Sequence, residues 1–173
     1  MPNAFEILGL PPAFDVEPAR IERAYLRQVA SLHPDSSDGD DGDDAKAAAL
    51  NKARATLLNP ERRAQELLAV LGGTPGVAPG ALPGGFLMSI METREEVEAA
   101  LASGDAAARA KWLAWATTER AAYIASAAGL FSKAAADPSA SRQQLRETLN
   151  AWRYIERLAE QLDPAYDHGS EGV

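Results

Sequence analysis

Apolar positions recur along this chain with the period of an α-helix, and no stretch alternates with the period of a β-strand. Alanine, the residue with the highest helix propensity, is abundant, and β-branched residues are few. The pattern therefore predicts an all-α protein. Seven helices are expected, at about residues 3–8, 18–32, 46–58, from 60 onward, 86–102, 105–133 and 141–163.

Residues that favour helix ends mark several of these boundaries. Pro18 falls in a first turn, where a missing N–H costs little. Asn59 stands before a proline and is expected as an N-cap, and Asp105 is expected to cap the long sixth helix. Ser141 and Gln144 have the spacing of a capping box, which predicts the start of the seventh helix there.

Two segments break the helical pattern. Residues 36–44 read SSDGDDGDD, and the repulsion between their charges together with glycine freedom predicts a mobile acidic loop. A calcium loop is disfavoured, because Gly39 and Ala48 stand where an EF-hand needs ligand oxygens. Residues 72–85 alternate proline with glycine, which predicts a linker between two domains.

Composition narrows the classes of function. The formal net charge of -8 argues against sequence-independent nucleic-acid binding and against an anionic membrane surface as the partner. The absence of cysteine excludes disulfides and thiolate chemistry, and His33 and His168 are too few for a histidine-rich metal site. No metal or cofactor is expected. With neither a signal-peptide pattern nor a long apolar run, a cytoplasmic location is expected.

The second predicted helix has two distinct faces and a defined end. One face is apolar and is expected to be buried: Ile21, Tyr25, Val29 and Leu32. The other face is basic: Arg20, Arg23 and Arg27. A proline disfavours helical conformation in the residue before it, so the helix must end at His33-Pro34-Asp35. These polar side chains are expected to project from a loop.

The context of this tripeptide resembles the J domain of DnaJ-type co-chaperones. The similar segments are FEILGLP at residues 5–11, His33-Pro34-Asp35, Asn51-Lys52-Ala53 and LLNPERRA at residues 57–64. The resemblance implies an antiparallel helical hairpin that docks on an ATP-dependent chaperone of the DnaK/HscA type (heat shock protein 70 family) and promotes its ATP hydrolysis. The implied chaperone-binding residues are His33, Pro34, Asp35, Arg23, Arg27 and Arg20. One departure from the pattern is Leu26, where a basic residue is common.

The fifth predicted helix carries more apolar residues than one buried face needs. Its core stripe is expected to be Phe86, Ile90, Val97 and Leu101. Leu87, Met88 and Met91 project from an adjacent face, which Glu92 and Glu95 border. These residues either pack against the following helices or form an exposed protein-binding surface with an acidic rim.

The seventh predicted helix shows a similar division. Its core side is expected to be Leu145, Leu149, Trp152 and Ile155. Tyr154 points away from that side and is typical of an interface residue. Both Leu87 and Tyr154 are therefore expected to be at least half exposed. The aromatic residues of the sixth helix are interpreted as core.

The order of these segments resembles the HscB/Jac-type co-chaperones of iron–sulfur cluster assembly, most specifically in FLMSIMETREE (86–96) and RYIERLAEQL (153–162). The resemblance implies an L-shaped arrangement of a J domain (1–71), a linker (72–85) and a C-terminal three-helix bundle (86–165). In that family the bundle binds an IscU-type scaffold protein. The implied scaffold-binding residues are Leu87, Met88, Met91, Glu92, Glu95 and Tyr154, with Ala99 a departure from an acidic position.

The residues and the two resemblances leave three hypotheses of function. The leading hypothesis is an adaptor that brings the cluster scaffold to the chaperone and stimulates its ATPase. A second is a general J-domain co-chaperone with a different client. A small helical enzyme is disfavoured, because the sequence shows no metal-ligand spacing, no nucleophile–base pair and no phosphate-binding glycine loop.

Overall fold

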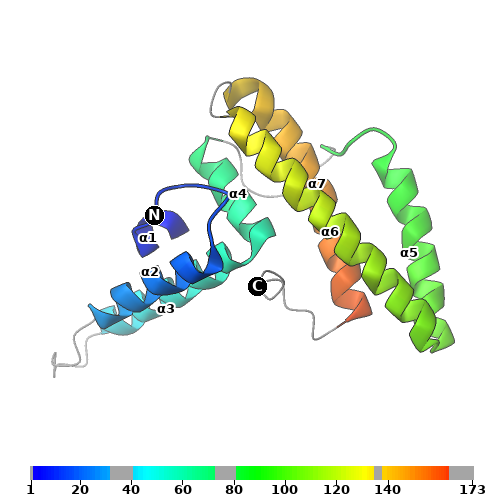
Figure 1. The fold of residues 1–173 in the computed structure, drawn as a ribbon, viewed down its shortest axis with the longest axis horizontal. Coiled ribbons are helices and arrows are strands. Elements are labelled where there is room, and N and C mark those ends of the chain that lie inside the picture. Colours follow the sequence, from blue (N-terminus) through cyan, green and yellow to red (C-terminus); the bar gives the residue numbers. More distant parts are fainter. Residues whose placement is uncertain (1, 32–40, 73–80, 135–137, 164–173) are drawn as a thin grey trace. The chain divides into compact units, whose positions relative to one another are not determined.

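The computed structural model describes residues 2–31, 41–72, 81–134 and 138–163. These residues form seven α-helices and no strand, so the all-α prediction is confirmed for the described part of the chain. The chain divides into two compact units, with residues 2–70 described in the first and 71–163 in the second. The helices are α1 (Ala4–Leu8), α2 (Pro18–Ala30), α3 (Asp41–Leu58), α4 (Pro60–Val70), α5 (Phe86–Ser103), α6 (Ala106–Ala134) and α7 (Pro138–Leu162) (Figure 1).

Several helix ends lie where the sequence predicts them. The Asn59 side chain accepts a hydrogen bond from the Arg62 amide at 2.9 Å, and Asp105 accepts one from the Ala107 amide at 2.8 Å. Each bond satisfies an amide that has no partner inside its helix. Gly104 ends α5 with φ of 67°, a left-handed conformation that glycine adopts without strain.

Two predicted helix starts are wrong. α3 begins at Asp41, so the end of the acidic segment is helical and is not part of a mobile loop. Acidic residues are favoured at the positive end of a helix dipole, and this preference outweighs the charge repulsion at this helix start. α7 begins at Pro138, and Ser141 is a buried residue within the helix, so the capping-box prediction fails. Proline in the first turn is the better start signal in this case.

The first unit is built around α2 and α3, which lie side by side, with α1 packed on both (Figure 1). The Ala4 amide at the start of α1 donates a hydrogen bond of 2.8 Å to Glu66 of α4, which ties the two helices together. Side chains from all four helices and from the connection between α1 and α2 fill the core. They include Phe5, Leu8, Leu10, Phe14, Val16, Ile21, Ala24, Leu50, Ala53, Leu57, Leu67 and Leu68.

A buried arginine holds the connection between α1 and α2 in this core. The Arg63 guanidinium donates hydrogen bonds to the backbone carbonyls of Phe14, at 2.8 Å, and Leu57. It also lies 5.4 Å from the centre of the Phe14 ring. Burial lowers the pKa of Arg63, because desolvation disfavours the charged form. The two carbonyls compensate part of that cost.

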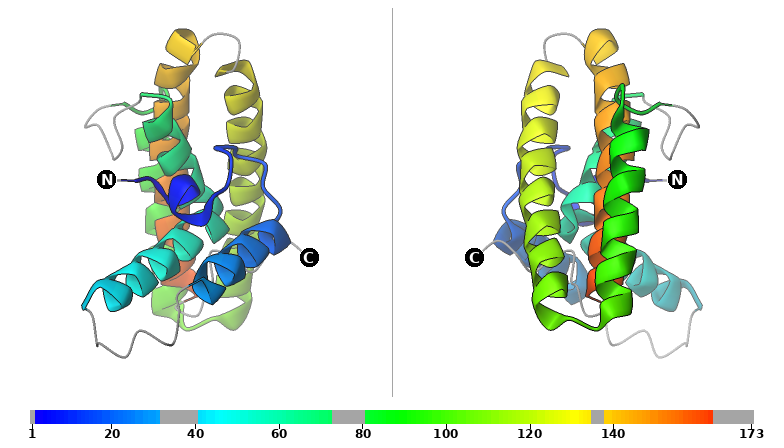
Figure 2. Two further views of the ribbon diagram at one scale, coloured as in Figure 1. Left: turned by 90° about the vertical axis from the view of Figure 1, so that its left-hand side faces the viewer. Right: turned by 90° about the vertical axis from the view of Figure 1, so that its right-hand side faces the viewer.

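The second unit is a three-helix bundle in which α6 and α7 form a long antiparallel hairpin and α5 packs against both (Figure 2). Its core confirms the stripe that was expected on α7, since Leu145, Leu149, Trp152 and Ile155 are all buried. On α5, Ile90 and Val97 are buried, and Phe86 and Leu101 are partly buried against the same cluster. The aromatic residues of α6 also pack on it, as expected: Trp112, Trp115 and Tyr123.

A charged pair lies inside this bundle, between α6 and α7. Arg120 is 4% exposed and Glu156 is 5% exposed. The Arg120 Nε atom lies 3.1 Å from Glu156 Oε1, and Trp152 Nε1 donates a hydrogen bond of 2.7 Å to the same oxygen. Buried charges are tolerated when they are paired and hydrogen-bonded in this way.

Candidate functional site

Helix α5 is fixed to the bundle along one stripe and exposes the rest of its surface. Ile90 and Val97 anchor it in the core. Asn150 of α7 holds the backbone just before α5, because its side-chain amide donates a hydrogen bond of 2.8 Å to the Ala81 carbonyl. The second apolar face remains accessible: Leu87, Met88 and Met91 are 53%, 72% and 57% exposed. Of the two interpretations of this face, the structure favours the exposed surface.

A groove of about 410 Å³ runs between α5 and α7. It brings together three of the sequence-predicted residues, because Leu87 and Met91 come from α5 and Tyr154 comes from α7. Its remaining lining residues are Ile90, Arg94, Arg157, Leu158 and Gln161. An apolar groove with a few polar groups at its edge is typical of a site that accepts a partner side chain.

The expectation that Tyr154 is at least half exposed is wrong. Its side chain is partly buried, and its ring lies edge-on to Phe86 with ring centres 5.8 Å apart. The helical wheel of α7 placed Tyr154 away from the core stripe, but α5 covers that side of α7 and supplies Phe86. Tyr154 is thus a wall of the groove that is held in place by an aromatic contact.

The other three predicted residues lie outside the groove. Met88, Glu92 and Glu95 are exposed on α5 but do not line it. With about 100° between successive residues, these three side chains lie about 60–120° around α5 from the direction midway between Leu87 and Met91. The predicted set therefore divides into a groove strip and an acidic outer strip on one helix.

Two arginines that sequence reasoning missed also line the groove. Arg94 follows Met91 by one turn of α5, and Arg157 follows Tyr154 by one turn of α7. Residues three positions apart share a helix face, so this spacing is the signal that could have found them. Arg94 is engaged on its own helix, with its Nε atom 2.8 Å from Glu98.

In the first unit, the outer face of α2 is the exposed candidate surface. Arg20, Arg23 and Arg27 are exposed, and their side chains form no hydrogen bond or ion pair with any other described residue. Leu26 lies beside them and is 60% exposed. Val29, expected in the core, is also exposed, because the buried face of α2 is centred nearer Ala24.

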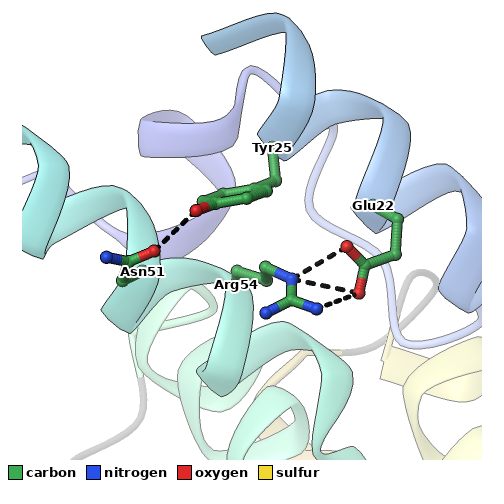
Figure 3. A network of polar contacts seen from close by, with 4 residues as sticks. All are labelled: Glu22, Tyr25, Asn51 and Arg54. Carbon is green, nitrogen blue, oxygen red and sulfur yellow. Dashed lines mark hydrogen bonds and ion pairs between the residues drawn. The ribbon is translucent and has the colours of Figure 1, made fainter. Parts of the chain in front are cut away.

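The inner side of α2 is bound to α3 by polar contacts (Figure 3). Arg54 forms a forked ion pair with Glu22, with the shortest contact at 2.7 Å, and its guanidinium lies 5.2 Å from the Tyr25 ring centre. The Tyr25 hydroxyl donates a hydrogen bond of 2.7 Å to the side-chain oxygen of Asn51. The hydrogen bond to Glu22 raises the pKa of Arg54. These contacts fix the hairpin without using the arginines of the outer face.

Some of the predicted site lies beyond what the structure describes. His33, Pro34 and Asp35, together with Leu32, fall outside the described residues, as do residues 73–80 of the predicted linker. In the described part of the chain, no helix combines the length and apolarity that crossing a bilayer requires. The same residues contain no cluster of three or more acidic or histidine side chains suited to a metal ion.

Comparison with protein families assigns each unit separately. Residues 3–65 match the family described as "DnaJ domain", and residues 82–163 match the family described as "HSCB C-terminal oligomerisation domain". The first match spans α1 to α3 and the first half of α4, and the second spans α5 to α7. Together they include all or part of every helix that the structure describes.

Some individual relatives match this chain over nearly its full length. The "Co-chaperone protein HscB homolog" of Paraburkholderia phymatum is 30% identical over 91% of this chain and 90% of its own length. Among solved structures, "Chaperone HscB from Vibrio cholerae" superposes with a TM-score of 0.71 at 24% identity, covering 94% of this chain and 96% of that one. The crystal structure of human co-chaperone protein HscB superposes with a TM-score of 0.76 at 20% identity, covering 95% of this chain and 82% of that one.

Proposed function

We propose that this chain, which belongs to the HscB family of co-chaperones, is an adaptor in iron–sulfur cluster assembly. In this proposal the second unit binds an IscU-type scaffold protein, and the first unit docks on a DnaK/HscA-type chaperone of the heat shock protein 70 family. The His33-Pro34-Asp35 segment then stimulates ATP hydrolysis by that chaperone. The reaction occurs in the partner, and this chain supplies recognition.

The exposed apolar face of α5 is the observation that carries this proposal. Leu87, Met88 and Met91 are each more than half exposed, although buried residues of the same helix already hold α5 to the bundle. Their exposure is not needed for folding, and contiguous exposed apolar side chains mark protein-binding surfaces. Glu92 and Glu95 complete the proposed scaffold-binding set with Tyr154.

The outer face of α2 supports the chaperone-docking half of the proposal. Arg20, Arg23 and Arg27 have no partners among the described residues, so their charges are available to an acidic surface. Such contacts act mainly on association rate and register. Leu26, which is exposed at the edge of this basic face, adds an apolar contact.

Scaffold binding is tested by calorimetric titration of the purified scaffold protein into the full chain. Leu87→Ala should weaken binding by about 1–2 kcal/mol, roughly five- to thirtyfold. The matched control is Leu26→Ala, which makes the same change at a leucine of similar exposure in the other unit. The proposal fails if wild type does not bind the scaffold, or if the two variants bind it equally well.

Chaperone coupling is tested by the stimulated ATPase rate of the chaperone. His33→Gln should abolish stimulation and leave scaffold affinity unchanged. Arg27→Ala should weaken stimulation, most strongly at low salt, because exposed charges are screened within about 8 Å at physiological ionic strength. Arg62→Ala, at an exposed arginine of α4, is the control. Full stimulation by the His33 variant would exclude the proposed role of the tripeptide.

The same experiments decide between the adaptor and a general co-chaperone. A general co-chaperone would bind unfolded polypeptides through its second unit, whereas the adaptor binds the folded scaffold. Titration with a reduced, unfolded model protein should therefore give no binding that depends on Leu87.

A further inference from the structure

The groove between α5 and α7 combines an apolar interior with positive charge. Leu87, Met91 and Tyr154 supply apolar walls, and Arg94 and Arg157 supply the two charges. None of the described residues that line the groove is acidic. This contrasts with the chain as a whole, whose net charge is -8, and with the acidic outer strip of α5.

The two arginines differ in availability. Arg94 is held by Glu98 at 2.8 Å on its own helix. Arg157 is exposed, and its side chain forms no hydrogen bond or ion pair with another described residue. Arg157 is therefore the groove cation whose donors are available to a ligand. Its position one helical turn beyond Tyr154 places that charge at the wall of the apolar pocket.

We propose that Arg157 determines specificity in this groove by receiving a carboxylate of the scaffold-type partner. The carboxylate would belong to a segment whose neighbouring apolar side chain enters between Leu87, Met91 and Tyr154. This inference rests on the proposed function, since it names the chemistry by which the same surface recognises its partner. It adds a positive contact to a surface that the sequence predicted to be apolar and acidic.

The chemistry of the side chains supports this assignment. A guanidinium offers parallel N–H donors that match the two oxygens of a carboxylate, which a lysine ammonium cannot reproduce. An exposed ion pair contributes little by itself. An apolar side chain seated in the adjacent groove would exclude water from the pair, and this strengthens it and fixes the register of the partner segment.

The test is calorimetric titration of the apo scaffold protein into the full chain at low and at high salt. Arg157→Ala should weaken binding about five- to tenfold at low salt, and Arg157→Glu should weaken it further. Arg157→Lys should recover only part of the affinity. The salt dependence should be shallower for Arg157→Ala than for wild type, because one ion pair is missing. Leu87→Ala should lower affinity while keeping the wild-type salt dependence.

Lys133→Glu is the control, since it reverses an exposed charge on α6 of the same unit away from the groove. Urea unfolding of each variant verifies that the bundle is intact. The inference is overturned if wild type binds, Leu87→Ala weakens binding, and Arg157→Glu binds no worse than Lys133→Glu. Absence of binding by wild type instead overturns the proposed function, and this inference with it.

Discussion

The buried pair of Arg120 and Glu156 provides a sharp test of how the bundle is stabilised. Arg120→Met removes the positive charge and keeps most of the side-chain volume. Glu156→Gln removes the negative charge and keeps a side-chain oxygen. That oxygen can still accept the hydrogen bond from Trp152 Nε1, which is 2.7 Å long in the native pair. Each single variant removes one charge of the pair and leaves the other in the interior, whereas the double variant removes both.

The expected magnitudes follow from burial. Both side chains are about 95% buried, at 4% and 5% exposure, so water cannot solvate the charge that is left behind. Breaking a buried pair costs about 3–5 kcal/mol, whereas replacing both charges by neutral groups is often nearly neutral. Each single variant should lose about 3 kcal/mol of unfolding free energy, and the double variant should lose less than either single one.

Tryptophan fluorescence during urea unfolding measures this effect selectively. The chain has three tryptophans, and Trp112, Trp115 and Trp152 all lie in the second unit. Their signal therefore reports the unfolding of the bundle and not of α1 to α4. Additive losses, in which the double variant costs as much as both singles combined, would refute the view that each charge is tolerated because of the other.

Three further outcomes are expected. Arg63→Met should destabilise the first unit by about 2–4 kcal/mol, because the buried carbonyls of Phe14 and Leu57 lose the hydrogen bonds that the guanidinium donates. Glu22→Gln, in a partly exposed ion pair, should cost under about 1 kcal/mol, and amide hydrogen exchange of the full chain measures both effects. Val97→Ala should lower bundle stability by about 2 kcal/mol, and Leu87→Ala should leave the urea midpoint nearly unchanged. Burial and the nearby charge of Glu119 raise the pKa of Tyr123 in the folded state. The stability that this shift contributes is therefore complete below the unfolded pKa of about 10 and is lost as the pH rises above it. Tyr123→Phe should flatten this alkaline loss of unfolding free energy, and an unchanged slope of unfolding free energy against pH would contradict the reasoning.

Much of the fold follows from local sequence signals. Helix ends at Asn59, Gly104 and Asp105 depend on residues within one turn, so the sequence alone locates them. The core stripe of α7 is equally local, because its apolar residues recur at helical spacing. The start of α7 differs from the prediction because two helix-start signals compete there, and Pro138 in the first turn prevails over Ser141.

The candidate site was less accessible to sequence reasoning, because it depends on which helices touch. A helical wheel shows that Tyr154 is off the core stripe, but not that Phe86 covers it. Arg157 becomes part of a groove only because α5 runs alongside α7. Val29 has the spacing of a core residue, yet the centre of the interface lies nearer the small Ala24. These features arise from contacts between helices, so the sequence pattern of a single helix cannot predict them.

The choice of methionine on the exposed face of α5 has a chemical consequence. Met88 and Met91, two of the three methionines in the chain, hold their thioethers in solvent at 72% and 57% exposure. Flexible thioethers adapt to the contours of a partner, but oxidants convert accessible ones to sulfoxides, which are polar and chiral. Oxidation would place a hydrophilic group where an apolar contact is needed, and methionine sulfoxide reductases could reverse it. This face thus gains adaptability at the expense of resistance to peroxide.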